Sequence, residues 1–207
     1  MKNNNLIMIC GPAASGKTTL IKMLEDYFEA KYFRPVDSYF EISKQRSIPI
    51  EHAFSVVNRN EAEEFFCNVC KNNPWVIGDQ HLAIQFHRDS QMAVDNSIND
   101  DIKEEYSQAV SAEFINNLKN NNISILIILL KADPHVLFER AQKRYFEIGH
   151  AMRNKNEEEV EKELKSELLY FEQIVKDTQV DNVVIDTTNK DRKEVLLDAL
   201  KAIKELC

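Results

Sequence analysis

The feature that most constrains this chain is a pair of glycines five positions apart, followed at once by a lysine and a threonine. The 207 residues contain only four glycines, and two of them belong to this G-x-x-x-x-G-K-T pattern. An apolar stretch at 6–10 and an apolar-periodic segment at 19–28 flank it, which predicts a strand, a loop and a helix. In that setting glycines let backbone N–H groups point at phosphate oxygens, and the helix dipole adds to the attraction. The pattern predicts a nucleoside triphosphate site formed by Gly11, Pro12, Ala13, Ala14, Ser15, Gly16, Lys17 and Thr18.

Two side chains of this pattern, together with a later carboxylate, have predicted chemical roles. Lys17 can reach the β- and γ-phosphates, and the Thr18 hydroxyl is a ligand for Mg²⁺. Asp79 ends the apolar run 75–78, where a carboxylate would hold Mg²⁺ directly or through water. The alternative for Asp79 is the N-cap of a following helix. The predicted ligands of this site are therefore a nucleoside triphosphate and Mg²⁺.

Length and charge indicate the general class of protein. A chain of 207 residues suits a single domain, 1–207, that buries roughly 70% of its unfolded surface. The balance of 26 basic against 34 acidic residues argues against a nucleic-acid partner. No apolar run approaches the ~20 residues of a membrane span, and the N-terminus lacks the apolar core of a signal peptide. We expect a cytoplasmic protein without a membrane or nucleic-acid partner.

Apolar runs alternate with helix-periodic segments, which predicts a three-layer α/β domain with a parallel sheet. The runs 123–130 and 182–186 are apolar almost throughout, as in strands covered on both faces. Asp133 before Pro134 indicates a helix start, and apolar stripes at 160–175 and 196–203 have helical spacing. The predicted strands are 5–10, 32–36, 74–78, 123–130 and 182–186, and the predicted helices are 17–29, 59–72, 80–94, 100–120, 133–146, 156–179 and 190–206.

Residues just after the strands carry further predicted chemistry, because sites in parallel α/β folds lie at the carboxyl ends of the strands. Asp37 follows the second strand, where a carboxylate can take the proton of an acceptor hydroxyl. The alternative is that Asp37 caps the next helix. The acceptor is expected between this segment, with Tyr39, and the helix predicted at 80–94. On that helix Gln85 and Arg88 share one face and are candidate substrate contacts, with a solvated face as the alternative.

The segment after the fourth strand has the features of a mobile lid. Arg140 and Arg144 are four residues apart, and an irregular stretch with the last glycine and Arg153 follows. Guanidinium groups stabilise charge on a transferring phosphoryl group, and lid closure excludes water. We predict a lid at about 140–156, with Arg140 and Arg144 in catalysis and Arg153 toward the substrate. Surface ion pairs with acids such as Glu139 are the alternative for the helical pair.

The chain has four cysteines, two of which form a C-x-x-C. No second pair or histidine cluster accompanies Cys67 and Cys70 to complete a zinc site. Their apolar, helix-spaced neighbours favour buried helix cysteines over a redox pair or a zinc site. Reduced thiols are the default expectation.

Taken together, these motifs resemble the P-loop kinases of the thymidylate kinase and deoxynucleoside kinase group, over nearly the whole chain. The resemblance implies a five-stranded sheet of order 2-3-1-4-5, Mg·ATP as donor and homodimerisation through helices. It also implies a nucleotide contact at Thr19, and adenine beside the segment after the last strand, where Asn189 lies. The resemblance rests on residues 11–19, Asp37, the strand ending in Asp79, residues 130–140, Tyr170 in a long helix, and residues 184–188.

Three departures from the group's pattern bear on the substrate. Gln80 stands where the group has an arginine, and the lid lacks a clear Arg-Gly-Arg. Asp37 replaces the glutamate of deoxynucleoside kinases and is closer to P-loop kinases of small hydroxylated metabolites. The resemblance thus implies a small-molecule kinase whose acceptor is a nucleoside or nucleoside monophosphate, with another hydroxylated metabolite as the alternative. A non-catalytic nucleotide-binding regulatory protein is a further alternative, against which Lys17 and Asp79 argue.

Overall fold

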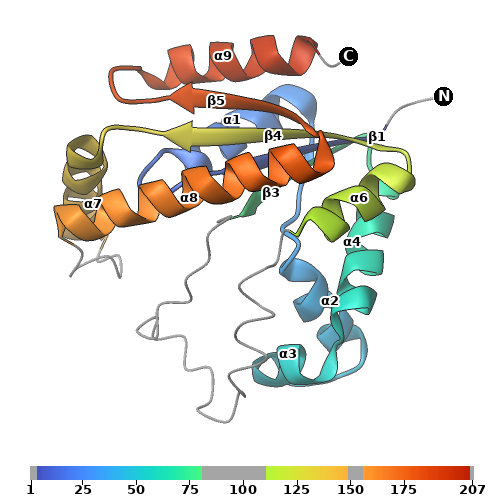
Figure 1. Ribbon diagram of the computed structural model, residues 1–207. Helices are drawn as coiled ribbons and strands as arrows, with labels where there is room; N and C mark the ends of the chain where they lie inside the picture. The colour runs from blue at the N-terminus through green and yellow to red at the C-terminus, as the bar shows by residue number, and fades with distance from the viewer. Residues whose placement is uncertain (1–3, 81–110, 149–155, 206–207) are drawn as a thin grey trace.

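The structure is a computed structural model that describes residues 4–80, 111–148 and 156–205 (Figure 1). In chain order the elements are β1 (Asn4–Cys10), α1 (Lys17–Phe28), β2 (Lys31–Tyr32), α2 (Asp37–Gln45), the 3-10 helix η1 (Ile50–His52), α3 (Ala53–Val56), α4 (Arg59–Asn72), β3 (Trp75–Gln80), α6 (Ala112–Asn120), β4 (Ile123–Lys131), α7 (Pro134–Ile148), α8 (Glu157–Thr178), β5 (Asp181–Asp186) and α9 (Arg192–Lys204).

All five strands belong to one parallel sheet with the order β2-β3-β1-β4-β5, as predicted. The central strand β1 pairs with β3 on one side and β4 on the other. Ile9 lies opposite Asp79, and Cys10 lies opposite Leu129. This register brings the carboxyl ends of three strands to one edge of the sheet, where the glycine loop begins.

Helices cover both faces of the sheet and give the predicted three layers (Figure 1). Side chains alternate along β1, so Ile7 and Ile9 pack toward α1 and α9, whereas Leu6 and Met8 pack toward α4, α6 and α8. Met8 and Ile9 are fully buried. Each such side chain contributes about 1.5–3 kcal/mol of burial free energy, so the two faces together anchor the strand under the loop.

The predicted helix signals are present at the ends of the C-terminal helices. Helix α7 begins at Pro134, and the Asp133 carboxylate accepts a hydrogen bond from the N–H of His135 at 3.0 Å. Helices α8 and α9 each begin with a capping box, formed on Asn156 and Asp191 respectively. The apolar stripes of both helices pack against the sheet or α7, as predicted.

The second strand is shorter than the predicted 32–36, and it runs into a helix, α2, that lies outside the predicted helices. The N–H of Phe33 makes the last ladder bond to β3. Pro35 has no N–H to continue the ladder. The N–H of Asp37 donates to the carbonyl of Arg34 at 2.9 Å, which turns the chain into α2. The short helices η1 and α3 are likewise additional to the prediction.

Two predicted helices differ from the structure or fall beyond it. Residue 80 belongs to β3, and the rest of the predicted helix 80–94 lies outside the described residues. The predicted helix 100–120 is confirmed only as α6, which the Ser111 hydroxyl caps by accepting from the N–H of Phe114 at 3.1 Å. A serine N-cap favours a helix start at that position.

The cysteines of α4 pack in the core, as predicted. Cys67 and Cys70 are free, buried and part of the cluster between α4, α6, α8 and the sheet. Burial raises the pKa of both thiols, so they stay neutral at ordinary pH. Within the described part of the chain, no three His, Cys, Asp or Glu side chains are grouped to hold a metal.

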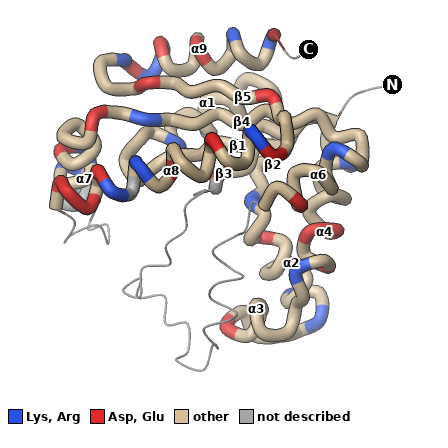
Figure 2. Tube along the Cα trace, viewed as in Figure 1, with Lys and Arg blue, Asp and Glu red and all other residues tan. Residues whose placement is uncertain are grey.

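The surface carries interspersed charges of both signs. Both α8 and α9 carry acidic and basic residues, within a chain of net charge −8 (Figure 2). Among the residues that the structure covers, no helix combines the length and apolarity needed to cross a bilayer.

Candidate active site

The loop between β1 and α1 is held open by residues in left-handed backbone conformations. Gly16 is the N-cap of α1 with φ 104°, and the N–H groups of Thr19 and Leu20 donate to its carbonyl. Gly11 has φ 137°, and Ala14 has φ 62°. The loop ends at the N-terminus of a 12-residue helix, where the helix dipole attracts anions.

The two loop glycines are needed for different reasons. A Cβ on Gly11 would lie 2.2 Å from the carbonyl oxygen of Leu130 in β4, an impossible contact, whereas a Cβ on Gly16 would meet nothing within 4 Å. Gly11 therefore lets the loop lie directly on the sheet, and Gly16 supplies only its backbone conformation.

We expect Gly11→Ala to destabilise the fold much more than Gly16→Ala. Strain and overpacking together cost roughly 2–5 kcal/mol at Gly11, against roughly 1–2 kcal/mol of backbone strain at Gly16. Chemical denaturation of both variants measures the difference. Equal losses of unfolding free energy would contradict the close approach of the loop to β4.

Lys17 lies inside the loop that it is predicted to serve. Its side chain is buried, and Nζ donates to the carbonyl oxygens of Gly11 at 2.5 Å and Pro12 at 2.9 Å. The neighbouring Ser15 hydroxyl is buried without a hydrogen-bond partner among the described residues. Buried polar groups are normally paired, so a lysine and a hydroxyl concentrated in this loop fit an anionic ligand.

Asp79 lies at the carboxyl end of β3, next to the start of the loop. Its Oδ1 accepts a hydrogen bond from the Tyr32 hydroxyl of β2 at 2.8 Å. Burial and this bond raise the pKa of Tyr32, which therefore remains a donor. The Tyr32 bond orients the carboxylate, as outer partners of metal-binding carboxylates do. Asp79 is a strand residue, so the alternative role as a helix N-cap lies outside the described structure.

Asp37 is bound by an arginine three residues before it. Nε and Nη2 of Arg34 donate to the carboxylate, with Nη2 2.6 Å from Oδ1, and the N–H of Arg34 donates to Oδ2 at 2.8 Å. Asp37 is the first residue of α2, whose N-cap is Val36 and has no side-chain cap bond. The Asp37 carboxylate thus binds Arg34 rather than capping α2, and the bond to Asp37 raises the pKa of Arg34.

Tyr39 belongs to a small aromatic cluster rather than standing free. Its ring lies 5.2 Å from that of Phe54 in α3, centroid to centroid, and packs on the core formed by Ile42, Val57 and Ala62. This packing fixes α2 against α3 and α4. A substrate contact by Tyr39 remains a prediction.

Thr187, just after β5, joins the glycine loop to α7. Its N–H donates to the carbonyl of Lys131 at 2.8 Å, and its hydroxyl lies 3.3 Å from the carbonyl of Ser15. Nη1 of Arg140 donates to that hydroxyl at 2.9 Å, and Nη2 donates to the Thr187 carbonyl at 2.6 Å. These bonds hold the Arg140 guanidinium against the loop after β5. Glu139, named as a partner in the alternative of surface ion pairs, lies beside His135, with Oε1 3.3 Å from Nε2.

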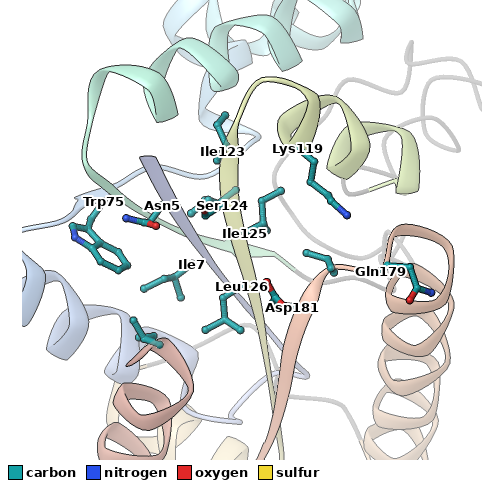
Figure 3. A pocket seen from close by; sticks show the side chains of 13 residues that line it. Asn5, Ile7, Trp75, Lys119, Ile123, Ser124, Ile125, Leu126, Gln179 and Asp181 are labelled. Atoms are coloured by element: carbon teal, nitrogen blue, oxygen red, sulfur yellow. The ribbon is translucent and has the colours of Figure 1, made fainter. Parts of the chain in front are cut away.

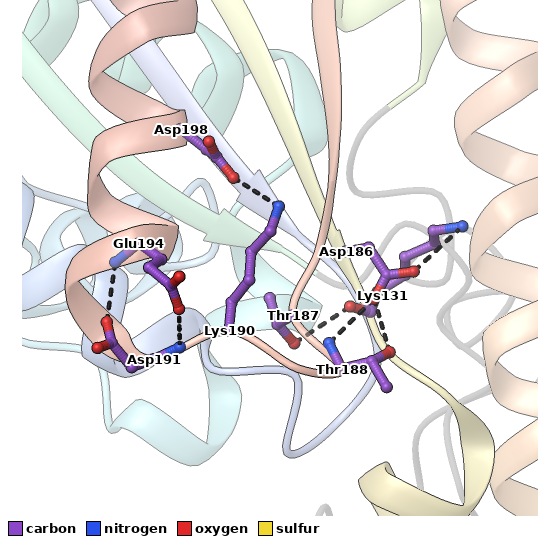
Figure 4. A network of polar contacts seen from close by, with 8 residues as sticks. All are labelled: Lys131, Asp186, Thr187, Thr188, Lys190, Asp191, Glu194 and Asp198. Atoms are coloured by element: carbon purple, nitrogen blue, oxygen red, sulfur yellow. Dashed lines mark hydrogen bonds and ion pairs between the residues drawn. The ribbon is translucent and has the colours of Figure 1, made fainter.

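The loop after β5 is fixed by further polar contacts (Figure 4). Asp186 accepts from the N–H and hydroxyl of Thr188 at 2.9 and 2.6 Å, and Lys190 pairs with Asp198 at 2.6 Å. The bonds from Thr188 lower the pKa of Asp186. Asn189, the predicted adenine neighbour, is exposed in this loop. These contacts fix the loop after β5 beside the glycine loop.

Several predicted site residues cannot be placed. Gln85, Arg88 and Arg153 lie outside the described residues. Arg144 lies within α7, but its side chain is not described, and the lid predicted at 140–156 is described only through residue 148. Three residues that contribute to the site are additional to the sequence prediction, namely Tyr32, Arg34 and Thr187.

A cavity of about 220 Å³ lies far from this site, at the amino ends of the strands (Figure 3). Its lining includes Asn5 of β1, Trp75 of β3, Ile123 of β4 and Asp181 at the start of β5. Ligand sites of parallel sheets lie at the opposite, carboxyl ends. The cavity is therefore not the phosphate site.

Comparison with known proteins supports the fold class. No family model and no curated protein matches this chain. Among solved structures, the YorR protein of Bacillus subtilis in complex with phosphorylated GDP is 16% identical over 96% of this chain and 95% of that chain, with a TM-score of 0.57. Deoxyadenosine kinase from M. mycoides with bound products is 17% identical over 97% of this chain and 99% of that chain (TM-score 0.53).

A third solved structure has the same fold. A gluconokinase from Sinorhizobium meliloti 1021 is 12% identical over 100% of this chain and 95% of that chain, with a TM-score of 0.51. At these identities the likeness concerns the fold alone. The chain has the fold of the P-loop kinases, and the nucleoside kinase subgroup is not singled out by these neighbours.

Proposed function

We propose that this chain is an ATP-dependent small-molecule kinase. The observation that carries the proposal is the glycine loop with the buried Lys17. Asp79 lies at the carboxyl end of β3, which pairs with the strand before that loop, and Asp37 is the first residue of α2. A phosphate cradle, a metal-binding carboxylate and an acceptor-facing carboxylate are the parts that phosphoryl transfer needs. The acceptor proposed first is a nucleoside or nucleoside monophosphate, and a different hydroxylated metabolite is second.

In the proposed reaction the acceptor oxygen forms a bond to the γ-phosphorus of ATP. The bond from that phosphorus to the β,γ-bridging oxygen breaks, ADP leaves, and the hydroxyl proton passes to Asp37 or to solvent. Lys17 exchanges its carbonyl partners for phosphate oxygens and stabilises the charge on the transferring group. Asp37 orients the attacking hydroxyl, which is most of the protein's task because this transition state is loose.

Thr18 and Asp79 fit Mg²⁺. Both offer oxygen ligands, and Thr18 is exposed at the first turn of α1, beside the phosphate cradle. Mg²⁺ is typically bound through one or two protein oxygens together with substrate phosphates and water. The metal, when bound, would neutralise phosphate charge, while Tyr32 keeps the Asp79 carboxylate oriented.

Coupled detection of ADP tests this function. The protein is incubated with Mg·ATP and a panel of nucleosides, nucleoside monophosphates and hydroxylated metabolites. We expect ADP release that at least one acceptor stimulates well above the rate with water alone. ATP binding by thermal shift with no stimulation by any acceptor would contradict the kinase and favour a nucleotide-binding regulatory protein.

A further inference from the structure

Four polar side chains meet where β2 and β3 end, and only two of them have a role so far. Tyr32 binds Asp79, and Arg34 binds Asp37. Strands β2 and β3 are paired, and the bond from Tyr32 to Asp79 joins their ends, so the two pairs lie at one corner of the site. Arg34 and Asp37 are three residues apart, and a tight turn between them brings their side chains together.

The Arg34 guanidinium holds the Asp37 carboxylate in one orientation. It donates from two nitrogens, and the backbone N–H of Arg34 adds a third, independent contact to Oδ2 at 2.8 Å. Fork-like pairing of this kind fixes geometry as well as charge. The side chains are 42% and 23% exposed, so the pair borders the open side of the site, where an acceptor would bind.

The charge at this corner bears on the acceptor. Arg34 and Asp37 form an ion pair with Nη2 2.6 Å from Oδ1, so this guanidinium is already paired with a carboxylate. A phosphate group arriving there would meet the Asp37 carboxylate, and Arg34 already donates to that carboxylate. A hydroxyl meets no such repulsion, and it can donate its hydrogen to Asp37.

We infer that Arg34 is a positioning residue of the acceptor site, and that the Arg34–Asp37 pair selects an acceptor hydroxyl over an acceptor phosphate. The inference rests on the proposed kinase function and names the chemical class of its acceptor. Arg34 acts through Asp37. Its substitution should therefore lower acceptor-dependent turnover, and it should have no further effect in a variant that carries Asp37→Asn.

The first test compares Arg34→Gln with Arg46→Gln. Arg46 also pairs with an acid, Glu61, and is similarly exposed, at 47%, but it lies at the far end of α2. Arg34→Gln keeps the backbone bond to Asp37, so the start of α2 should survive. We expect acceptor-dependent turnover to fall by about 10²-fold in Arg34→Gln, since misplacing a reacting group costs this much. Arg46→Gln should match the unmodified protein.

Two further arms complete the test. In a double-mutant cycle, Arg34→Gln should add no further loss to Asp37→Asn, because one residue acts through the other. In acceptor assays, thymidine, deoxyadenosine and gluconate are each compared with the monophosphate of the same compound. We expect at least one of the unphosphorylated compounds to stimulate ADP release. None of the monophosphates, each tested alone, should do so.

The outcomes separate the inference from the kinase function. Equal turnover of Arg34→Gln and Arg46→Gln, or additive losses in the cycle, would overturn the role of Arg34 while the kinase stands. Stimulation by monophosphates alone would overturn the preference for a hydroxyl. Absence of stimulation by every acceptor of both classes would overturn the kinase function and the inference with it.

Discussion

Lys17→Ala is expected to abolish phosphoryl transfer, with a loss of about 10³-fold or more in turnover, because a preorganised cation at the transferring group is removed. Nζ already lies inside the loop, 2.5 Å from the carbonyl of Gly11 and 2.9 Å from that of Pro12. Binding of ATP would replace these carbonyls by phosphate oxygens over a short movement. Coupled ADP production with Mg·ATP and a stimulating acceptor measures the loss.

The matched control for this variant is Lys22→Ala. Lys22 lies on the same helix, α1, but is exposed. Its removal should leave turnover unchanged. Because Lys17→Ala leaves two loop carbonyls without their donor, a stability loss of about 1–3 kcal/mol is also expected, and turnover must be measured well below the melting temperature. Substantial turnover in folded Lys17→Ala would refute the site itself.

Asp37→Asn is expected to lower acceptor-dependent turnover by about 10²–10⁴-fold while ATP binding persists, since the variant removes a base and charge-assisted acceptor. The amide keeps the shape of the side chain but weakens the bonds to Arg34. In the unmodified protein these bonds raise the pKa of the Arg34 guanidinium. Steady-state kinetics and ATP titration on the same preparation separate the two effects.

Asp198→Asn serves as the control for Asp37→Asn. Asp198 also pairs with a basic residue, Lys190 at 2.6 Å, but it lies on α9. A role of Asp37 confined to the start of α2 would cost about 1 kcal/mol of stability and leave the rate intact. Such a result would contradict the acceptor role. A much smaller rate loss in a stable variant would also argue that the acceptor is a phosphate.

The sheet was predictable because its strands carry strong local signals. The run 123–130 is apolar and forms the buried strand β4, and Asp133-Pro134 marks a helix start that the structure confirms. The run 182–186 also forms a strand, but β5 is the edge of the sheet and Val184 is 42% exposed, so the expected cover on both faces is wrong. The glycine spacing likewise predicts a loop that the structure shows lying directly on β4. Where periodicity or capping is strong, local sequence determines the element.

Most features that could not be predicted from the sequence depend on contacts between segments far apart in the chain. Pro35 ends β2 early and the turn at Asp37 starts α2, although the residues 32–36 look strand-like. The bond from Tyr32 to Asp79 requires the pairing of β2 with β3, which no local pattern gives. Arg140 has the spacing of a phosphate contact, yet it binds Thr187, whose position depends on the end of β4. Side-chain partners across strands follow from register rather than from motif.

The most direct test of the central claim is to follow the phosphoryl group itself. The protein is incubated with Mg·ATP and each hydroxyl acceptor, and the products are identified by mass spectrometry. The proposed kinase predicts an acceptor that carries one added phosphoryl group, formed in step with ADP and lost in Lys17→Ala. ADP accompanied only by inorganic phosphate, or no ADP despite bound ATP, would contradict it.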